Sequence, residues 1–125
     1  MYPSHLRYTK EHEWLSVSGE TGTLGITDFA QKELGDIVYV ELPEVGKQVS
    51  PGDTLGTIES VKAVSEVYAP VGGTVVEVNG ALSDKPETVN SDPHGGGWIC
   101  RLRLADPGEA ERLLDASAYR ELVSV

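Results

Sequence analysis

Residues 59–65 read Glu59-Ser60-Val61-Lys62-Ala63-Val64-Ser65, and they place one lysine between two β-prone runs. The preceding run, residues 52–58, opens with a Gly-Asp turn signal, and the following run, residues 64–70, ends at a proline. Runs that are bounded in this way predict the two strands of a β-hairpin. Lys62 would then lie at the tip of the hairpin, where its side chain is free to reach a partner.

Lys62 taken alone has an ordinary explanation, because lysines at hairpin tips are mostly solvating surface residues. The nearest other lysines are Lys47 and Lys85, so a modifying enzyme that recognises the hairpin would find a single amine to acylate. Acylation would remove the positive charge of that amine. The spacing alone favours a plain surface lysine, and the residue types around it must decide between the two interpretations.

The chain has 125 residues, which suffice for one domain with a modest core and no disulfides. We therefore predict a single domain over residues 1–125. The only cysteine, Cys100, lies in an alternating run, residues 98–104, that places it on one face with Trp98 and two leucines. This pattern predicts a strand in which Cys100 is a core residue and not a nucleophile.

Twenty acidic and ten basic side chains give the chain a formal net charge of -10. This charge repels a phosphate backbone and argues against nucleic acid as a partner. It would hasten encounter with basic surfaces on partner proteins, although it can equally serve only to keep the protein in solution. Residues 1–7 show no targeting pattern, and no run approaches the length of a membrane span. The sequence predicts a cytoplasmic protein without a membrane partner.

Further short strands and helices are predicted on both sides of the hairpin. Strands are expected over residues 13–18, 23–26, 37–42, 74–78 and 98–104, with a short β segment between Gly46 and Gly52. Thr27 as N-cap and Gly35 as stop signal predict a short helix between them. Asn79 is expected to cap a helical turn over residues 80–83. Residues 85–97 are rich in Pro, Asn, Asp and Gly, which predicts an irregular surface segment.

The C-terminal segment, residues 106–123, is predicted to be helical. Asp106-Pro107-Gly108-Glu109 has the pattern of a capping box that begins a helix through Leu114, and Asp115 can begin a second helix over residues 116–122. The residues expected to pack on the sheets are Leu113, Leu114, Tyr119, Leu122 and Val123. Many short strands with short helices at the edges predict a mostly β sandwich or flattened barrel.

Other chemistry has weak support in the sequence. His5, His12 and His94 show no metal-ligand spacing with one another or with Cys100, so no metal site is predicted. Residues 95–97 are three glycines that precede a strand, and they lack the lysine and the helix of a phosphate-binding loop.

The lysine segment resembles the lipoyl-attachment segment of the glycine cleavage system H protein family. The resemblance begins with Glu59 to Ser65, continues through Tyr68-Ala69-Pro70 and Gly72-Gly73-Thr74-Val75, and extends over about residues 8 to 122. The other segments that carry it, in the same order, are residues 8–14, 25–31, 34–43, 77–79, Leu82, 89–90, 92–93, 97–98, 113–116 and Tyr119. Val64 stands where a small residue is usual. Pro93-His94-Gly95-Gly96-Gly97-Trp98 replaces the usual Pro-Tyr-Gly-x-Gly-Trp, and His94 and Gly96 predict a more flexible loop.

The resemblance implies a lipoyl-domain-like barrel-sandwich hybrid of short antiparallel strands, with peripheral helices and a helical C-terminus. It also implies that lipoate is joined to Lys62 through an amide, within the attachment hairpin Glu59, Ser60, Val61 and Ala63. In the family this arm takes methylamine from the P protein, a pyridoxal-phosphate glycine decarboxylase, to the T protein, a tetrahydrofolate-dependent aminomethyltransferase. The L protein, dihydrolipoamide dehydrogenase, then reoxidises the arm. A lipoyl ligase or transferase attaches the group, and the chain itself is a carrier without catalytic steps.

Family positions further imply a sheltering groove for the loaded arm, formed by Glu13, Glu11, Ser65 and Glu66. Carboxylates there would hold the terminal cation of the arm.

Three alternatives stay open at this stage. One is a lipoate-relay protein or another lipoylated carrier that is not devoted to glycine cleavage. A biotin carboxyl carrier normally has methionines beside its lysine, whereas Val61 and Ala63 stand here and the only methionine is Met1. An enzyme that forms a Schiff base needs a desolvated lysine with a lowered pKa, which the nearby Glu59 and Glu66 disfavour.

Overall fold

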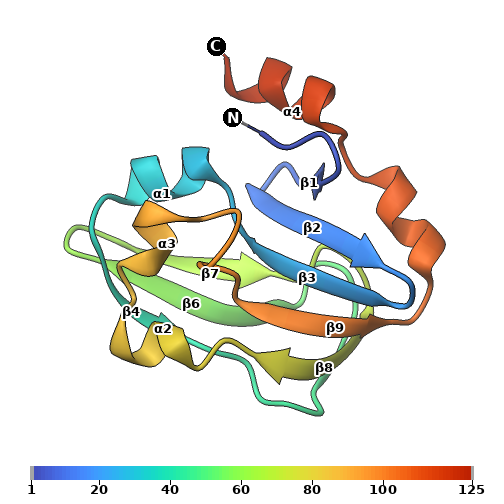
Figure 1. Ribbon diagram of the computed structural model, residues 1–125, viewed down its shortest axis with the longest axis horizontal. Helices are drawn as coiled ribbons and strands as arrows, with labels where there is room; N and C mark the ends of the chain where they lie inside the picture. The colour runs from blue at the N-terminus through green and yellow to red at the C-terminus, as the bar shows by residue number, and fades with distance from the viewer. Residues whose placement is uncertain (1, 125) are drawn as a thin grey trace.

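The structure is a computed structural model that describes residues 2–124. It is built from two antiparallel sheets, with short helices at one side and at the C-terminal end (Figure 1). The larger sheet has the strand order β1-β2-β3-β9-β8-β5, and the smaller sheet has the order β4-β6-β7. The strands are β1 Arg7–Tyr8, β2 Glu13–Ser18, β3 Thr21–Ile26, β4 Ile37–Glu41, β5 Gln48–Val49, β6 Thr54–Ser60, β7 Val64–Tyr68, β8 Gly73–Val78 and β9 Cys100–Leu104. The mostly β class that the sequence predicts is thus confirmed.

The helical elements are short. They are α1 Asp28–Leu34, α2 Ala81–Asp84, α3 Thr88–Ser91, the 3₁₀ helix η1 Pro107–Arg112 and α4 Ala116–Val123. The predicted limits of α1 are confirmed, because the Thr27 side chain accepts a hydrogen bond from the Ala30 N–H, and Gly35 ends the helix at a φ of 80°. A positive φ costs glycine little, which explains a glycine at this stop.

The main hydrophobic core combines residues from both sheets. Leu15 and Leu24 of the larger sheet and Ile58 of the smaller one are fully buried in it. Burying one such side chain is worth roughly 1.5–3 kcal/mol, so this cluster supplies much of the stability. Cys100 belongs to the same cluster, as its alternating strand predicted, and burial raises the pKa of its thiol to about 12. The thiol is therefore protonated at neutral pH and remains a packing residue.

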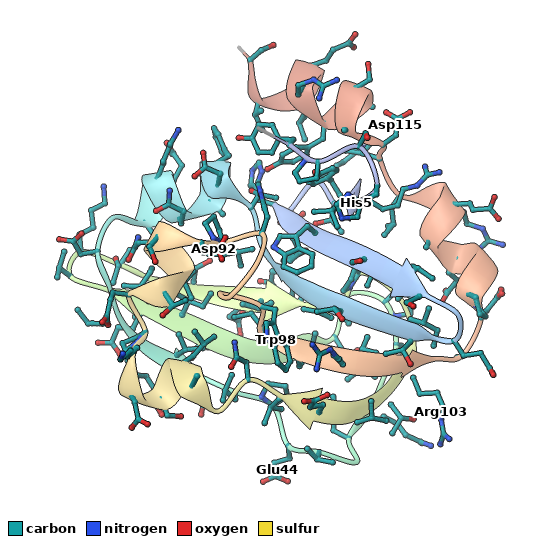
Figure 2. The ribbon with its side chains drawn as sticks, viewed as in Figure 1. His5, Glu44, Asp92, Trp98, Arg103 and Asp115 are labelled. Atoms are coloured by element: carbon teal, nitrogen blue, oxygen red, sulfur yellow. The ribbon has the colours of Figure 1, made fainter. Side chains whose placement is uncertain are left out.

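A second, smaller cluster joins the two ends of the chain, which lie side by side in Figure 1. Tyr119 of α4 stacks on Tyr8 of β1 with ring centroids 4.7 Å apart. Asp115, labelled in Figure 2, is the N-cap of α4 and accepts a hydrogen bond from the Ala118 N–H. The predicted packing face is wrong for Leu122, which is 39% exposed.

Several predicted strand boundaries are corrected by the observed strand pairing. β3 begins at Thr21, because a two-residue loop at Gly19 and Glu20 joins it to β2. β8 begins at Gly73 and β9 at Cys100. Trp98 precedes β9, and the Arg101 Cζ lies over its ring, 4.0 Å from the ring centroid.

The segment predicted to be irregular, residues 85–97, contains α3. The predicted capping role of Asn79 is wrong. Its side chain donates instead to the carbonyl oxygens of Gly96 and Trp98, so it stabilises the glycine loop rather than α2. The Gly96 N–H also donates to the Asp92 carboxylate. These bonds tie the loop to Asn79 and Asp92.

The β4 alternation and the capping box are also wrong in detail. A bulge in β4 places Val38 and Tyr39 both at the surface, while Val40 is buried. The Glu109 carboxylate accepts from the Gly72 N–H instead of turning back to its own helix. η1 then ends at Arg112, and Leu114 forms a two-way backbone bridge with Tyr8, so the predicted helix does not continue through Leu114.

His94 packs into the fold at the beginning of α1. Its Nε2 accepts a hydrogen bond from the Asp28 N–H at 3.1 Å, and its ring lies against Trp14 and Tyr2. Burial lowers the pKa of His94, and the charges of Asp28 and Asp92 offset this only in part. The imidazole must be neutral to accept the Asp28 bond, so this contact depends on pH.

We predict that the titration of His94 makes the free energy of unfolding rise with pH below about 6.5, the pKa of an unperturbed histidine, and level off above it. The folded pKa of His94 lies below its unfolded value, so in this window the unfolded chain binds the extra proton and acid favours unfolding. Urea titrations at several pH values measure the slope of the unfolding free energy against pH. His94→Gln keeps an acceptor at the position of Nε2 for the Asp28 N–H and should reduce the slope, to which His12, whose pKa burial also lowers, still contributes. His5→Gln, at an exposed position, is the matched control. An unchanged slope in His94→Gln would contradict the assignment.

Candidate functional site

Lys62 lies at the tip of the β6–β7 hairpin, as the sequence predicts, and its side chain is exposed. The Ser60 N–H donates to the Ala63 carbonyl at 2.8 Å and closes the turn. The Ser60 hydroxyl oxygen accepts from the N–H groups of Lys62, at 3.2 Å, and Ala63, at 3.0 Å. Ser60 is only 6% exposed, so a buried hydroxyl holds the backbone on which the lysine is mounted.

The connection between α1 and β4 supports the same tip, and the closed end of the hairpin lies beside it in Figure 1. The Val61 N–H donates to the Asp36 carbonyl at 3.0 Å. The stem of Lys62 passes close to Gly35, since a Cβ placed on Gly35 would lie 3.5 Å from the Lys62 Cε. The backbone of the tip is therefore tied on both sides, while the end of the lysine is left free.

Asn90 of α3 in turn holds the α1–β4 connection. Its side-chain oxygen accepts from the Ile37 N–H at 2.9 Å, and its amide nitrogen donates to the Gly35 carbonyl and to the Gln31 side chain, each at 2.9 Å. Every bond spans more than fifty residues of sequence, so no local pattern could reveal this support.

Asn90→Ala should cost about 1–3 kcal/mol of unfolding free energy, because it leaves three polar groups without partners. It should also speed hydrogen exchange at the Val61 amide, which depends on the connection that Asn90 holds. The matched control is Asn79→Ala, which removes two side-chain hydrogen bonds at the glycine loop and should leave Val61 exchange unchanged. If Val61 exchanges at the wild-type rate in Asn90→Ala, Asn90 does not support the tip.

The Lys62 amine has no ion-pair partner among residues 2–124, where the ion pairs are Lys32–Asp28 at 3.0 Å and Arg101–Glu77 at 2.6 Å. An exposed, unpaired amine on a fixed turn can be reached by an acylating enzyme. This setting is unlike that of a Schiff-base lysine, which needs a desolvated pocket. The geometry therefore fits the covalent attachment of an acyl group such as lipoate at Lys62.

Three of the four predicted groove residues gather around Tyr68. The Glu13 carboxylate is 2% exposed and accepts from the Thr9 hydroxyl at 2.6 Å and the Tyr68 N–H at 3.2 Å; burial raises its pKa despite these bonds. The Tyr68 hydroxyl donates to Glu66 at 3.0 Å. The pKa of Tyr68 is raised by that bond first and by the charge of Glu66, with smaller contributions from Glu11 and Glu13. Negative charge is thus concentrated beside β7.

Ser65 is not brought into this group. It is paired with Ile58, which is fully buried, while Glu66 is paired with Thr57, so the two neighbours point to opposite faces of the hairpin. No hydrogen bond of the Ser65 hydroxyl is found in the described part of the chain. Tyr68, which sequence reasoning did not single out, takes the central place because the backbone of β7 meets Glu13 fifty-five residues away.

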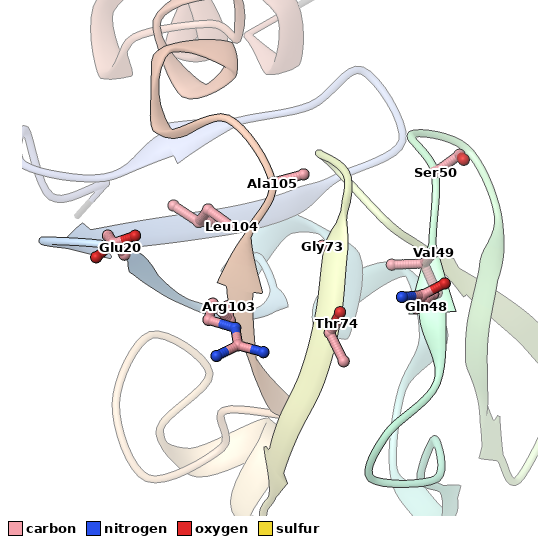
Figure 3. Close-up of a pocket in the computed structure, with 9 residues that line it drawn as sticks. All are labelled: Glu20, Gln48, Val49, Ser50, Gly73, Thr74, Arg103, Leu104 and Ala105. Atoms are coloured by element: carbon pink, nitrogen blue, oxygen red, sulfur yellow. The ribbon is translucent and has the colours of Figure 1, made fainter.

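An open hollow lies between β5, β8 and β9, and Figure 3 shows Gln48, Thr74 and Arg103 on its walls. None of its lining residues belongs to the lysine hairpin. Within residues 2–124, no three His, Cys, Asp or Glu side chains are placed to hold a metal ion. No helix in the same range has the length and apolar composition needed to cross a membrane.

Comparisons with known proteins agree on one family. The family model described as glycine cleavage H-protein matches residues 6–125. The chain is 55% identical over 122 residues to the glycine cleavage system H protein of Acidobacterium capsulatum, covering 98% of this chain and 94% of that protein. It is 57% identical to the protein of the same name from Escherichia coli, covering 97% and 95% of the two chains.

A solved structure gives the same result for the fold. The crystal structure of a glycine cleavage system H protein from Mycobacterium marinum superposes with a TM-score of 0.90 and 39% sequence identity. The match covers 98% of this chain and 99% of that one. The expected lipoyl-domain-like barrel-sandwich fold is thereby confirmed.

Proposed function

This chain belongs to the glycine cleavage H-protein family, and we propose that its lipoyl group is attached to Lys62. The chain is a lipoyl-carrier protein of the glycine cleavage system. A carrier devoted to another pathway is not favoured, because the matches extend over nearly the whole chain and not only over the hairpin.

The main evidence for attachment at Lys62 is that its amine is exposed while the turn that bears it is held by hydrogen bonds. The bound group would supply a disulfide that accepts the aminomethyl group of glycine. Ser60, Val61 and Ala63 fix the turn backbone, so the protein presents the arm from one point. A tether anchored in this way raises the effective concentration of the reactive group near a docked enzyme.

The partners that we propose are the P, T and L proteins, which would meet the arm in turn, and a lipoyl ligase or transferase that attaches it. The chain itself supplies no catalytic step in this scheme and acts as one carrier domain. A cytoplasmic location stays a prediction.

Intact mass of the protein purified from its native cell tests the attachment. Under lipoate-replete conditions the mass should exceed that of the chain by one lipoyl group, and peptide mapping should place the increment on Lys62. Addition of the modified protein to purified P protein should support glycine decarboxylation. A native protein without any adduct would overturn the proposal.

We further propose that Glu11, Glu13 and Glu66 shelter the amine end of the loaded arm, with Ser65 excluded by its orientation. Glu13 accepts from the Tyr68 N–H and Glu66 accepts from the Tyr68 hydroxyl, at the end of β7 farther from Lys62, and the charge of Glu11 also acts on Tyr68. A cation placed there would gain charge-assisted hydrogen bonds that water alone does not provide.

Glu11→Gln together with Glu66→Gln should shorten the lifetime of the methylamine-loaded protein by about tenfold, equivalent to roughly 1.4 kcal/mol. Release of ammonia from the isolated loaded protein measures this lifetime. Glu13→Gln is tested separately, because Glu13 also accepts the Tyr68 N–H and its loss can disturb β7. Glu44→Gln, at an exposed position marked in Figure 2, is the control. Equal lifetimes in the double variant and the wild type would count against the groove.

A further inference from the structure

We propose that the outer face of the β4-β6-β7 sheet is the docking surface for the enzyme that attaches lipoate to Lys62. The outer face is defined here by two rows of cross-strand neighbours. They are Tyr39, Glu59 and Val64 in the row nearest the tip, and Glu41, Thr57 and Glu66 in the next. This inference rests on the carrier function proposed above and adds the surface by which one partner is recognised.

The first observation is apolar exposure close to Lys62. Tyr39 is 54% exposed and Val64 is 66% exposed, and they flank Glu59 in one row. Val61 at the tip and Val38 in the β4 bulge are 69% and 49% exposed. Of the eight large hydrophobic side chains exposed among the described residues, four therefore surround this end of one small sheet. Single exposed valines are ordinary, whereas such a gathering is typical of an interaction surface.

The second observation is charge. Glu41, Glu59 and Glu66 all point to the outer face, and no basic residue belongs to either row. Glu41 accepts from the Thr57 hydroxyl at 3.1 Å and Glu66 accepts from Tyr68, so two of the carboxylates are already oriented. A complementary surface would present an apolar pocket rimmed by arginines. An arginine can lie over the Tyr39 ring and pair with Glu59 at the same time.

Because the outer face lies beside Lys62, we expect the attaching enzyme, and not the other proposed partners, to dock there. That enzyme must bring its acyl donor into contact with the Lys62 amine itself, so its footprint must include the residues beside the tip. An enzyme that meets the completed arm can dock an arm's length away. The row nearest the tip contains Val64, two residues from Lys62 in the sequence, with Tyr39 on the other side of Glu59, so it would lie within the footprint of the attaching enzyme.

The test uses the full-length unmodified chain with a purified bacterial lipoate–protein ligase, lipoate and ATP. Tyr39→Ser and Val64→Ser should each raise the KM for the chain about tenfold or more, with kcat nearly unchanged, because both side chains are exposed and neither takes part in the transferred bond. Val45→Ser removes an equally exposed valine, 61% accessible, outside the two rows and should have no effect. Glu59→Gln should make the reaction rate less sensitive to salt.

The outcomes separate this inference from the carrier function. If the wild type is acylated at Lys62 but Tyr39→Ser and Val64→Ser keep the wild-type KM, the docking surface is wrong and the carrier function stands. The same conclusion holds if Val45→Ser raises the KM as much as Tyr39→Ser and Val64→Ser do. If the wild type itself is never acylated at Lys62, the attachment site fails together with the docking surface. Unfolding curves of each variant should superpose on that of the wild type, since neither side chain is part of the core.

Discussion

Lys62→Arg is expected to abolish the lipoyl mass increment and to reduce the glycine decarboxylation supported by the chain to background. Arginine keeps the positive charge and much of the length of lysine, so the hairpin should fold as before. Its guanidinium stays protonated at any working pH, however, and it offers no free amine for amide formation. The effect should be complete, because Lys62 is the only lysine in the β6–β7 hairpin.

The measurement is intact mass of wild type and variant from lipoate-replete cells, followed by decarboxylation with purified P protein. Lys47→Arg and Lys85→Arg are the matched controls, since both lysines are exposed and outside the hairpin. Each control should keep the full increment and full activity. A lipoyl adduct that survives in Lys62→Arg would move the attachment site to another residue.

Gly56→Ala is expected to destabilise the fold by at least about 3 kcal/mol, which is a large part of the stability of an ordinary small domain. Gly56 is buried in β6, where a Cβ would overlap the Glu41 carbonyl oxygen of β4. The obstacle is backbone, so relief requires the two strands to separate and not merely a side chain to turn. Because β6 also carries the lysine turn, acylation of Lys62 should fall together with stability.

Urea or guanidinium unfolding of Gly56→Ala measures the decrease in the free energy of unfolding directly. Gly80→Ala is the matched control, because a Cβ at Gly80 meets no atom within 4 Å and its φ of −61° suits any residue. The control should stay within about 0.5 kcal/mol of the wild type. Equal stability of the two variants would show that β4 and β6 can adjust to an added methyl group.

Much of the fold was open to prediction because its signals are local. Thr27 and Gly35 mark the two ends of α1 through the chemistry of capping, and the alternation around Cys100 marks β9 as a core strand. The lysine between two β-prone runs predicts a hairpin with Lys62 at its tip, and the structure confirms that placement. Each of these features depends on residues that are close together in the sequence.

The site was predictable only in part, for the same reason. The resemblance named Glu11, Glu13 and Glu66, but it could not show that Glu13 is buried under Tyr68 or that Ser65 points to the other face. The capping pattern at Glu109 failed because Gly72, from a different part of the chain, uses its carboxylate. A local rule can fail where a partner distant in sequence takes up the same side chain.

The family, the mostly β class and the lysine at the hairpin tip can all be inferred from the amino-acid sequence. What holds that lysine in place and what surrounds it became clear from the folded chain: the Asn90 bonds to the α1–β4 connection, the β4 bulge that exposes Val38 and Tyr39, and the carboxylates around Tyr68. The difference lies in the range of the interactions. Turns, caps and alternation act between near neighbours and leave a pattern, whereas hydrogen bonds and packing between segments dozens of residues apart exist only once the sheets have closed.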